Sequence, residues 1–279
     1  MIPLALNIVC SVCFGHIMKW AERHGANPLW VAAYNYLVAS SGCAVLTLLV
    51  HPTGRVLFTF LTGSWGGVCY LVSLLYYFAA VARLGVGRAT SAIRIAVAVP
   101  VAVALLVWHE PVQPIQVLGL ALVVLALPLL GCGRAGAAQG SVLRTMSLLA
   151  PLFLITGLGQ LAARIFSDGA PAGNTFLYLS CLFAGAAVSA LVAVRWQRVP
   201  TRGPDLPFGL LLGTANVAAN LSLLAALRVL PSAVVFAVSS SAGVVLAAVT
   251  GVIVWRERLS RPAIGGVALA AAAVVLLVR

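Results

Sequence analysis

Apolar segments of about 20 residues recur along the whole chain, and this spacing constrains the fold more than any other feature of the sequence. A helix that crosses a bilayer needs about 20 mainly apolar residues. The breaks between segments carry Pro, Gly or charged residues. We therefore predict an all-α integral membrane protein with ten transmembrane helices, near residues 3–20, 29–50, 57–82, 86–108, 115–132, 146–167, 174–194, 206–229, 232–254 and 262–278.

The composition excludes several other classes of protein. Of the 279 residues, 62% are hydrophobic and 8% are charged, which is more apolar surface than a water-soluble domain can bury. The net charge is +12, but the basic residues are scattered between apolar segments, so we expect no nucleic-acid partner. The six cysteines lie in or beside apolar segments. They favour packing over a metal or redox site, and we expect no cofactor.

An internal repeat divides the chain. Residues 66–131 correspond without a gap to residues 213–278, at a constant offset of 147. An internal repeat in a membrane chain is typical of a transporter built from two related halves. Matched pairs include Gly66 with Gly213, Trp108 with Trp255, and Glu110 with Glu257.

The repeat predicts the domain organisation. The first five-helix repeat covers residues 1–132, a small and polar linker covers residues 133–145, and the second five-helix repeat covers residues 146–279. Because five is odd, the second repeat must enter the membrane from the opposite side. We therefore predict two inverted repeats, with a substrate site near the midplane between them.

The basic residues predict an orientation. With ten spans, twelve Lys and Arg residues fall on one face of the membrane and three on the other. The positive-inside rule then makes the face with twelve cytoplasmic and places both termini outside.

Two turns carry a resemblance to a known family. The fourth and ninth predicted helices end in Trp108-His109-Glu110 and Trp255-Arg256-Glu257-Arg258-Leu259, and a related stretch runs from Arg83 to Pro100. With the ten-helix plan, these residues resemble the EamA-type permeases of the drug/metabolite transporter superfamily. The family turn usually reads Gly-Glu-Arg-Leu, whereas His109 and Arg256 replace the glycine here and Pro111 follows the first Glu.

The resemblance implies a function and a topology. Relatives of this kind export amino acids and other small metabolites, and more distant ones exchange sugar phosphates or nucleotide sugars. They are usually drawn with both termini in the cytoplasm, which is opposite to the orientation that the charge count predicts.

Arg94 is the clearest candidate for a substrate contact. It lies about two turns into the fourth predicted helix, roughly 12 Å along its axis. An Arg at this depth is costly and usually faces a cavity or a partner. It could bind an anionic group of the substrate by a bidentate contact, with its repeat-mate Ser241 and the neighbouring Ser239 as hydroxyl partners. The alternative is that Arg94 extends to the lipid headgroups.

Five further residues are candidates for substrate binding. His16 could carry a coupling proton, or it could lie at the membrane interface. Asn216 and Asn220 are one turn apart and could bind a substrate or hold helices together. Tyr34 and Tyr70 could line a cavity, although aromatic residues near helix ends often form interfacial belts.

The acidic residues limit the substrate class. All five of them lie at helix ends or in breaks, and Asp168 is placed to pair with Arg164 four residues earlier. A cationic substrate would favour a carboxylate inside the membrane. We therefore expect an anionic or neutral substrate; the acids are Glu22, Glu110, Asp168, Asp205 and Glu257.

These observations favour a secondary transporter for a small anionic or zwitterionic metabolite, such as an amino acid, an organic acid or a phosphorylated compound. It would act by alternating access, as an exporter or exchanger, in the inner or plasma membrane of a bacterium. We expect no enzyme activity. The expected partners are the small-molecule substrate, membrane lipids and a coupling proton, with the chain a monomer or a homodimer. A flippase for a lipid-linked substrate and a non-transporting membrane scaffold remain the alternatives.

Overall fold

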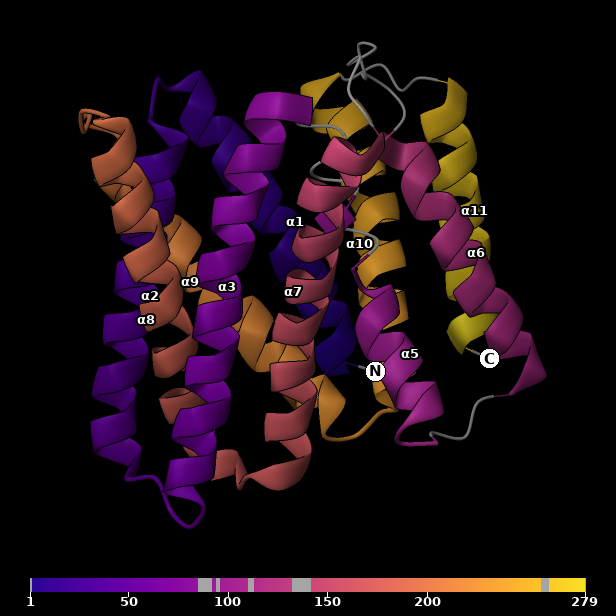
Figure 1. The fold of residues 1–279 in the computed structure, drawn as a ribbon, viewed down its shortest axis with the longest axis horizontal. Helices are drawn as coiled ribbons and strands as arrows, with labels where there is room; N and C mark the ends of the chain where they lie inside the picture. Colours follow the sequence, from indigo (N-terminus) through magenta and orange to yellow (C-terminus); the bar gives the residue numbers. More distant parts are fainter. Residues whose placement is uncertain are drawn as a thin grey trace. The chain divides into compact units, whose positions relative to one another are not determined.

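The computed structural model describes residues 2–84, 92–93, 96–109, 113–131, 142–256 and 261–278, and its ordered elements there are all helical (Figure 1). This confirms the predicted all-α class. The short 3-10 helix η1 (Ala172–Asn174) precedes α8. The ten α-helices of the described residues are α1 (Ile2–Arg23), α2 (Pro28–Val50), α3 (Val56–Leu84), α5 (Ala98–Leu106), α6 (Pro114–Gly131), α7 (Val142–Gly169), α8 (Thr175–Gln197), α9 (Asp205–Leu227), α10 (Ser232–Trp255) and α11 (Arg261–Val278).

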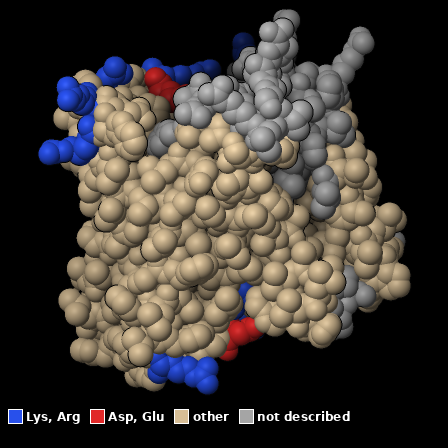
Figure 2. Space-filling view, viewed as in Figure 1, with Lys and Arg blue, Asp and Glu red and all other residues tan. Residues whose placement is uncertain are grey.

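Seven of these helices are long and apolar enough to cross a membrane: α1, α2, α3, α7, α8, α9 and α10. Large apolar side chains point outward, for example Leu48 and Leu57, which are 73% and 70% exposed. On the face drawn in Figure 2, the charged side chains of the described residues lie toward the upper and lower ends of the picture. This arrangement suits a bilayer as the solvent. Spans at the other three predicted positions remain a prediction.

The predicted helix over residues 86–108 is interrupted. The described part has a helical Ala92–Ile93, a turn at residues 96–97, and then α5. Pro100 in the first turn of α5 explains the break. Proline has no N–H to donate to the carbonyl of Ala96, and that carbonyl instead accepts from the Val99 N–H at 3.0 Å.

The chain folds into two compact units that do not coincide with the two sequence repeats. The first unit comprises Met1–Leu75 and Gly159–Val229, and the second comprises Tyr76–Leu158 and Leu230–Arg279. Each unit therefore draws helices from both halves of the sequence, and α3 and α7 contribute residues to both units.

The first unit is built around α2, which packs against α8 and α9, while α1 packs against α9 (Figure 1). Glycines make these close approaches possible. A Cβ on Gly185 of α8 would lie 2.5 Å from the Cα of Gly67 on α3. Similarly, a Cβ on Gly209 of α9 would lie 2.4 Å from the Cβ of Tyr34 on α2. Such contacts leave no room for a side chain, so the glycines bring the helix backbones together.

The second unit is built around α10 and α11. Helix α11 packs against α6 and α10, and α10 also packs against α5. Here again glycine allows a close approach, because a Cβ on Gly119 of α6 would lie 2.9 Å from Leu277 of α11. Leu152 is fully buried in a cluster with Ala80.

The offset of 147 reappears in the backbone. Helices α2 and α8 both have 23 residues, and their first residues, Pro28 and Thr175, are 147 positions apart. Two pairs of residues with this offset have a positive φ, and Arg198 and Arg256 are in the left-handed αL conformation. His51 and Arg198 have φ of 54° and 49°, and His109 and Arg256 have φ of 48° and 55°. Glycine adopts this conformation at least cost, which explains why the family turn has glycine at the position of His109 and Arg256.

Candidate functional site

A chain of amide side chains crosses from α2 to α9 in the first unit. The Nδ2 of Asn216 donates to Oδ1 of Asn35 at 3.2 Å. The Nδ2 of Asn220 donates to Oδ1 of Asn216 at 2.9 Å and to its backbone carbonyl at 3.0 Å. Asn35 is fully buried. Of the two roles predicted for Asn216, the structure thus shows the bond that holds two helices together.

Helix α1 adds a fourth amide to this region. The Nδ2 of Asn7 donates to the carbonyl of Ala219 at 2.9 Å, so α9 receives polar contacts from both α1 and α2. The Nδ2 of Asn35 is buried, and no described residue accepts a hydrogen bond from it. A buried amide with a spare donor is the kind of group that could bind a polar substrate.

The other predicted site residues of the first unit are Tyr34, Tyr70 and His16. Tyr34 stacks on Trp30 with ring centroids 5.5 Å apart, and Trp30 donates its Nε1–H to the carbonyl of Val199 at 2.9 Å. Tyr70 is 38% exposed. His16 is half-buried on α1. None of these contacts tests a substrate role.

Two predicted residues belong to the second unit. Ser239 is half-buried and Ser241 is fully buried on α10, and among the described residues no group bonds to the Oγ of Ser241. Arg94, the predicted partner of these serines, lies outside the described residues, as do Glu110 and Glu257. The predicted contact between Arg94 and the serines therefore stays a prediction.

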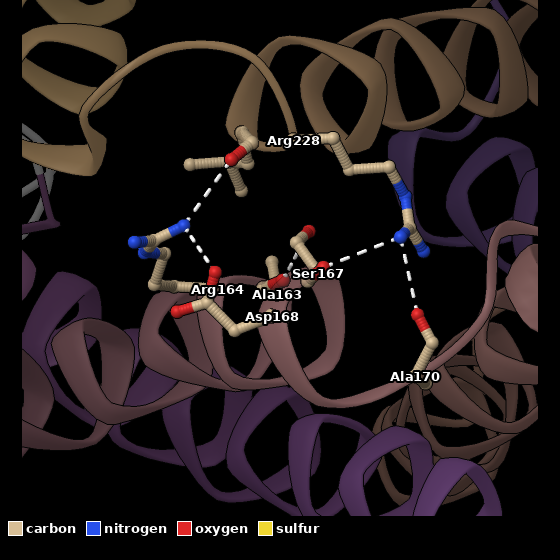
Figure 3. Close-up of polar contacts among 7 residues, drawn as sticks. Ala163, Arg164, Ser167, Asp168, Ala170 and Arg228 are labelled. Carbon is tan, nitrogen blue, oxygen red and sulfur yellow. Dashed lines mark hydrogen bonds and ion pairs between the residues drawn. The ribbon is translucent and has the colours of Figure 1, made fainter. Parts of the chain in front are cut away.

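The predicted ion pair at the end of α7 is confirmed. The Nη1 of Arg164 lies 2.6 Å from Oδ1 of Asp168. The same nitrogen donates to the carbonyl of Leu227, the last residue of α9, at 3.2 Å. Figure 3 shows that Arg164 reaches from α7 across to the end of α9.

Arg228 makes the reverse contact. It follows the last residue of α9, and its Nη1 donates to the carbonyls of Ser167 and Ala170 at 3.2 and 3.1 Å (Figure 3). Its guanidinium carbon lies 5.4 Å from the centre of the Phe166 ring. Burial lowers the pKa of Arg228 from its ordinary value, and the nearby Asp168 acts in the opposite direction.

Each arginine thus binds carbonyls at the end of the other's helix. Such carbonyls have no partner within their own helix and carry the negative end of its dipole. In the count of basic residues, Arg228 is one of the three on the face opposite the twelve, and the sequence predicts no further role for it. The available signal was its place directly after an apolar segment, where basic side chains commonly bind terminal carbonyls.

Two more arginines join the sequence halves at opposite ends of the first unit. Nη1 of Arg55 donates to the carbonyl of Gly169 at 2.7 Å. Nη1 of Arg202 donates to the carbonyl of Gly25 at 2.9 Å. Arg55 and Arg202 are 147 positions apart, so equivalent residues of the two repeats each bind a backbone carbonyl of the other repeat, at the last residue of α7 and in the turn after α1.

The carboxylate of Asp205, at the start of α9, binds backbone N–H groups. Its carboxylate is fully buried, and it accepts hydrogen bonds of 2.6 Å from the backbone N–H groups of Asn27 and Arg202. In the described parts of the seven candidate spans, the carboxylates lie only in the first or last turn, as predicted for Glu22, Asp168 and Asp205. The polar groups farther inside these spans include amides and hydroxyls.

Comparison with known proteins supports a transport function. The model of the EamA-like transporter family, a family of transporters and not of enzymes, matches residues 144–279. A crystal structure of another protein, 17% identical in sequence, superposes with a TM-score of 0.77 over 99% of this chain and 98% of its own. At this identity the likeness shows the fold alone. No curated protein matches the sequence.

Proposed function

We propose that the chain is a secondary transporter for a small anionic or zwitterionic metabolite, on the premise that residues 144–279 match the model of the EamA-like transporter family. It would work by alternating access, as an exporter or exchanger. The observation that carries the substrate class is the placement of the acids. No described carboxylate lies in the middle of a candidate span, whereas a cationic substrate would favour one there.

The exchange of contacts between the repeats supports an inverted arrangement. A Cβ on Gly66 would meet Leu182, and a Cβ on Gly213 would meet the carbonyl of Asn35. Gly213 follows Gly66 by 147 positions, and Leu182 follows Asn35 by the same offset. Equivalent glycines therefore pack on equivalent positions of the opposite repeat. A two-fold axis in the membrane plane, which relates inverted repeats, produces this exchange.

The polar groups of the spans suggest how such a substrate is bound. Nδ2 of Asn216 donates once, to Asn35, and so has a second N–H for a carboxylate. Nδ2 of Asn220 already donates to two acceptors of Asn216, so Asn220 can contribute its Oδ1 as an acceptor for an ammonium group. Arg94 remains the predicted anchor for the anionic group, with Ser239 and Ser241 as hydroxyl partners, and His16 remains the predicted carrier of a coupling proton.

Counterflow in proteoliposomes tests the proposal. Vesicles preloaded with an unlabelled amino acid, organic acid, sugar phosphate or cationic amine receive a trace of the same labelled compound. We expect accumulation of an anionic or zwitterionic compound, and loss of that accumulation in Arg94→Gln. Gly42→Ala is the control variant, because a Cβ on Gly42 meets no atom within 4 Å. Accumulation of the amine alone would contradict the substrate class, and movement of a fluorescent lipid without metabolite counterflow would indicate the flippase instead.

A further inference from the structure

The last turns of α8 carry an exposed apolar stripe. Val188, Val192 and Trp196 follow one another at intervals of four residues, which places them on one face of the helix. Their exposed fractions are 53%, 42% and 78%. In a chain that spans a membrane, an outward apolar stripe of this kind meets lipid acyl chains, and a Trp at its end lies at the level of the headgroups.

Two arginines lie at the headgroup end of this stripe. Arg195 follows Val192 by three residues and so shares its face of α8, and Arg198 is the C-cap of the helix. Both side chains are exposed. Within the described part of the chain, no hydrogen bond or ion pair occupies either guanidinium group. The stripe therefore ends in two cations that can bind an external anion.

The backbone of Arg198 gives a second, independent indication. Its φ is 49°, in the left-handed region. Glycine adopts this conformation at least cost, whereas a residue with a Cβ adopts it with strain. A strained residue at a surface position points to a role for its side chain, and this side chain is a cation beside an exposed Trp.

The neighbouring surface is also basic. Arg202 donates to the carbonyl of Gly25 at 2.9 Å, which joins the loop after α8 to the turn after α1. Residues 19–25 and 195–205 together contain five Lys or Arg residues and two acidic residues. One of these acids, Asp205, is fully buried and bound to backbone N–H groups. Lys and Arg side chains gather at the upper left of Figure 2, where Figure 1 draws the end of α8. This end of the first unit therefore attracts anions.

We propose that the last turns of α8 bind an anionic phospholipid, with an acyl chain along Val188 and Val192 and the phosphate group at Arg195 and Arg198. The ring of Trp196 lies between these two parts of the lipid. A free phosphate ion would meet only the arginines and would gain nothing from the apolar stripe, so the surface suits a lipid better than a soluble anion. This inference goes beyond the proposed transport function and does not depend on the substrate.

Thermal unfolding of the full-length protein tests this lipid site. The melting temperature is measured in neutral detergent as phosphatidylglycerol or phosphatidylcholine is added to the micelles, and its dependence on lipid content gives an apparent Kd. We expect phosphatidylglycerol to raise the melting temperature more than phosphatidylcholine does. In Arg198→Gly we expect the apparent Kd for phosphatidylglycerol to rise about fivefold, and in the double variant with Arg195→Gln about twentyfold, because each arginine near an anionic headgroup contributes separately.

Arg198→Gly also separates lipid binding from folding. Without added lipid, we expect this variant to melt at a higher temperature than the unaltered protein, because glycine relieves the strained backbone. A weaker response to phosphatidylglycerol in a variant that is itself more stable cannot arise from misfolding.

The matched control is Arg55→Gly. Arg55 is also exposed and has a positive φ of 46°, but it donates to the carbonyl of Gly169, near the start of α8. We expect this variant to keep the response to phosphatidylglycerol. Equal stabilisation by the two lipids, or equal loss of the response in Arg55→Gly and Arg198→Gly, would overturn the proposal. Stabilisation by inorganic phosphate as strong as that by phosphatidylglycerol would also overturn it, because it would show an anion site that needs no lipid.

Discussion

At the scale of single residues, left-handed backbone marks the ends of several helices. His109 and Arg256 have φ of 48° and 55°, and Arg256 is the C-cap of α10. For a residue with a Cβ, this conformation costs about 1–2 kcal/mol. The sequence showed that both residues replace a glycine of the family turn, but only the structure shows that the backbone kept the conformation for which glycine is suited.

Replacing these residues with glycine should stabilise the protein. We expect His109→Gly and Arg256→Gly each to raise the free energy of unfolding by up to about 1 kcal/mol, since relief of left-handed strain exceeds the added entropy of the unfolded chain. The measurement is denaturation in detergent with SDS. Arg195→Gly, within the right-handed last turn of α8, is the control and should lose about 1 kcal/mol. A loss of stability in Arg256→Gly equal to that of the control would show that no strain is stored there.

The sequence predicted neighbours on one helix but not contacts between helices. Asn216 and Asn220 were chosen because they lie one turn apart on one helix, and this local relation holds in the structure. Their partner Asn35 is 181 residues from Asn216. Helical periodicity carries no information about such a pairing, because it depends on which helices pack together. The reciprocal contacts of Arg164 and Arg228 were hidden for the same reason.

At the scale of helices, close approach distinguishes one glycine from another. The hydrophobic pattern predicted α2 and α8 nearly to their ends, because an apolar stretch bounded by Pro or Arg has a clear length. The pattern could not tell which glycines face a neighbouring helix. Gly185 faces the backbone of Gly67, whereas Gly42 faces open space. The interruption before α5 was missed because Pro100 follows an apolar run that offers no other sign of a break.

A pair of Gly→Ala variants separates these two situations. We expect Gly185→Ala to lower the free energy of unfolding by about 1–3 kcal/mol, because the new methyl group meets backbone atoms that cannot move aside. Gly42→Ala should raise it by about 0.5–1 kcal/mol, because alanine favours the helix and has room. Thermal unfolding in the same detergent compares the two. Similar values for both variants would mean that α3 and α8 do not approach as closely as the structure shows.

At the scale of the whole molecule, the compact units and the sequence repeats divide the chain differently. The first unit combines Met1–Leu75 with Gly159–Val229. The repeat could be read from the sequence because its offset is constant, and the same offset holds in α2 and α8. The exchange of helices between halves could not be read, because it depends on contacts between the repeats and not on the pattern within each.

The proposed inversion predicts opposite accessibility for equivalent residues. In a background without cysteine, we expect Arg55→Cys to react with a membrane-impermeant maleimide in intact cells, and Arg202→Cys to react only after permeabilisation. Both side chains are exposed in the structure, so burial does not limit the reaction. Reaction of both from the same side would exclude the inverted arrangement. Reaction of Arg202→Cys alone in intact cells would keep the inversion and place both termini in the cytoplasm.

The first unit combines early and late segments of the chain, and this has a consequence for its biosynthesis. A ribosome makes Asn35 early, but Asn216, its bonding partner on α9, emerges only after a further 180 residues have been joined to the chain. Until then, Asn7 on α1 and Asn35 on α2 have no α9 to form hydrogen bonds with. Gly67 on α3 likewise has no α8 to pack against. The early helices therefore lack these partners until α8 and α9 have been made.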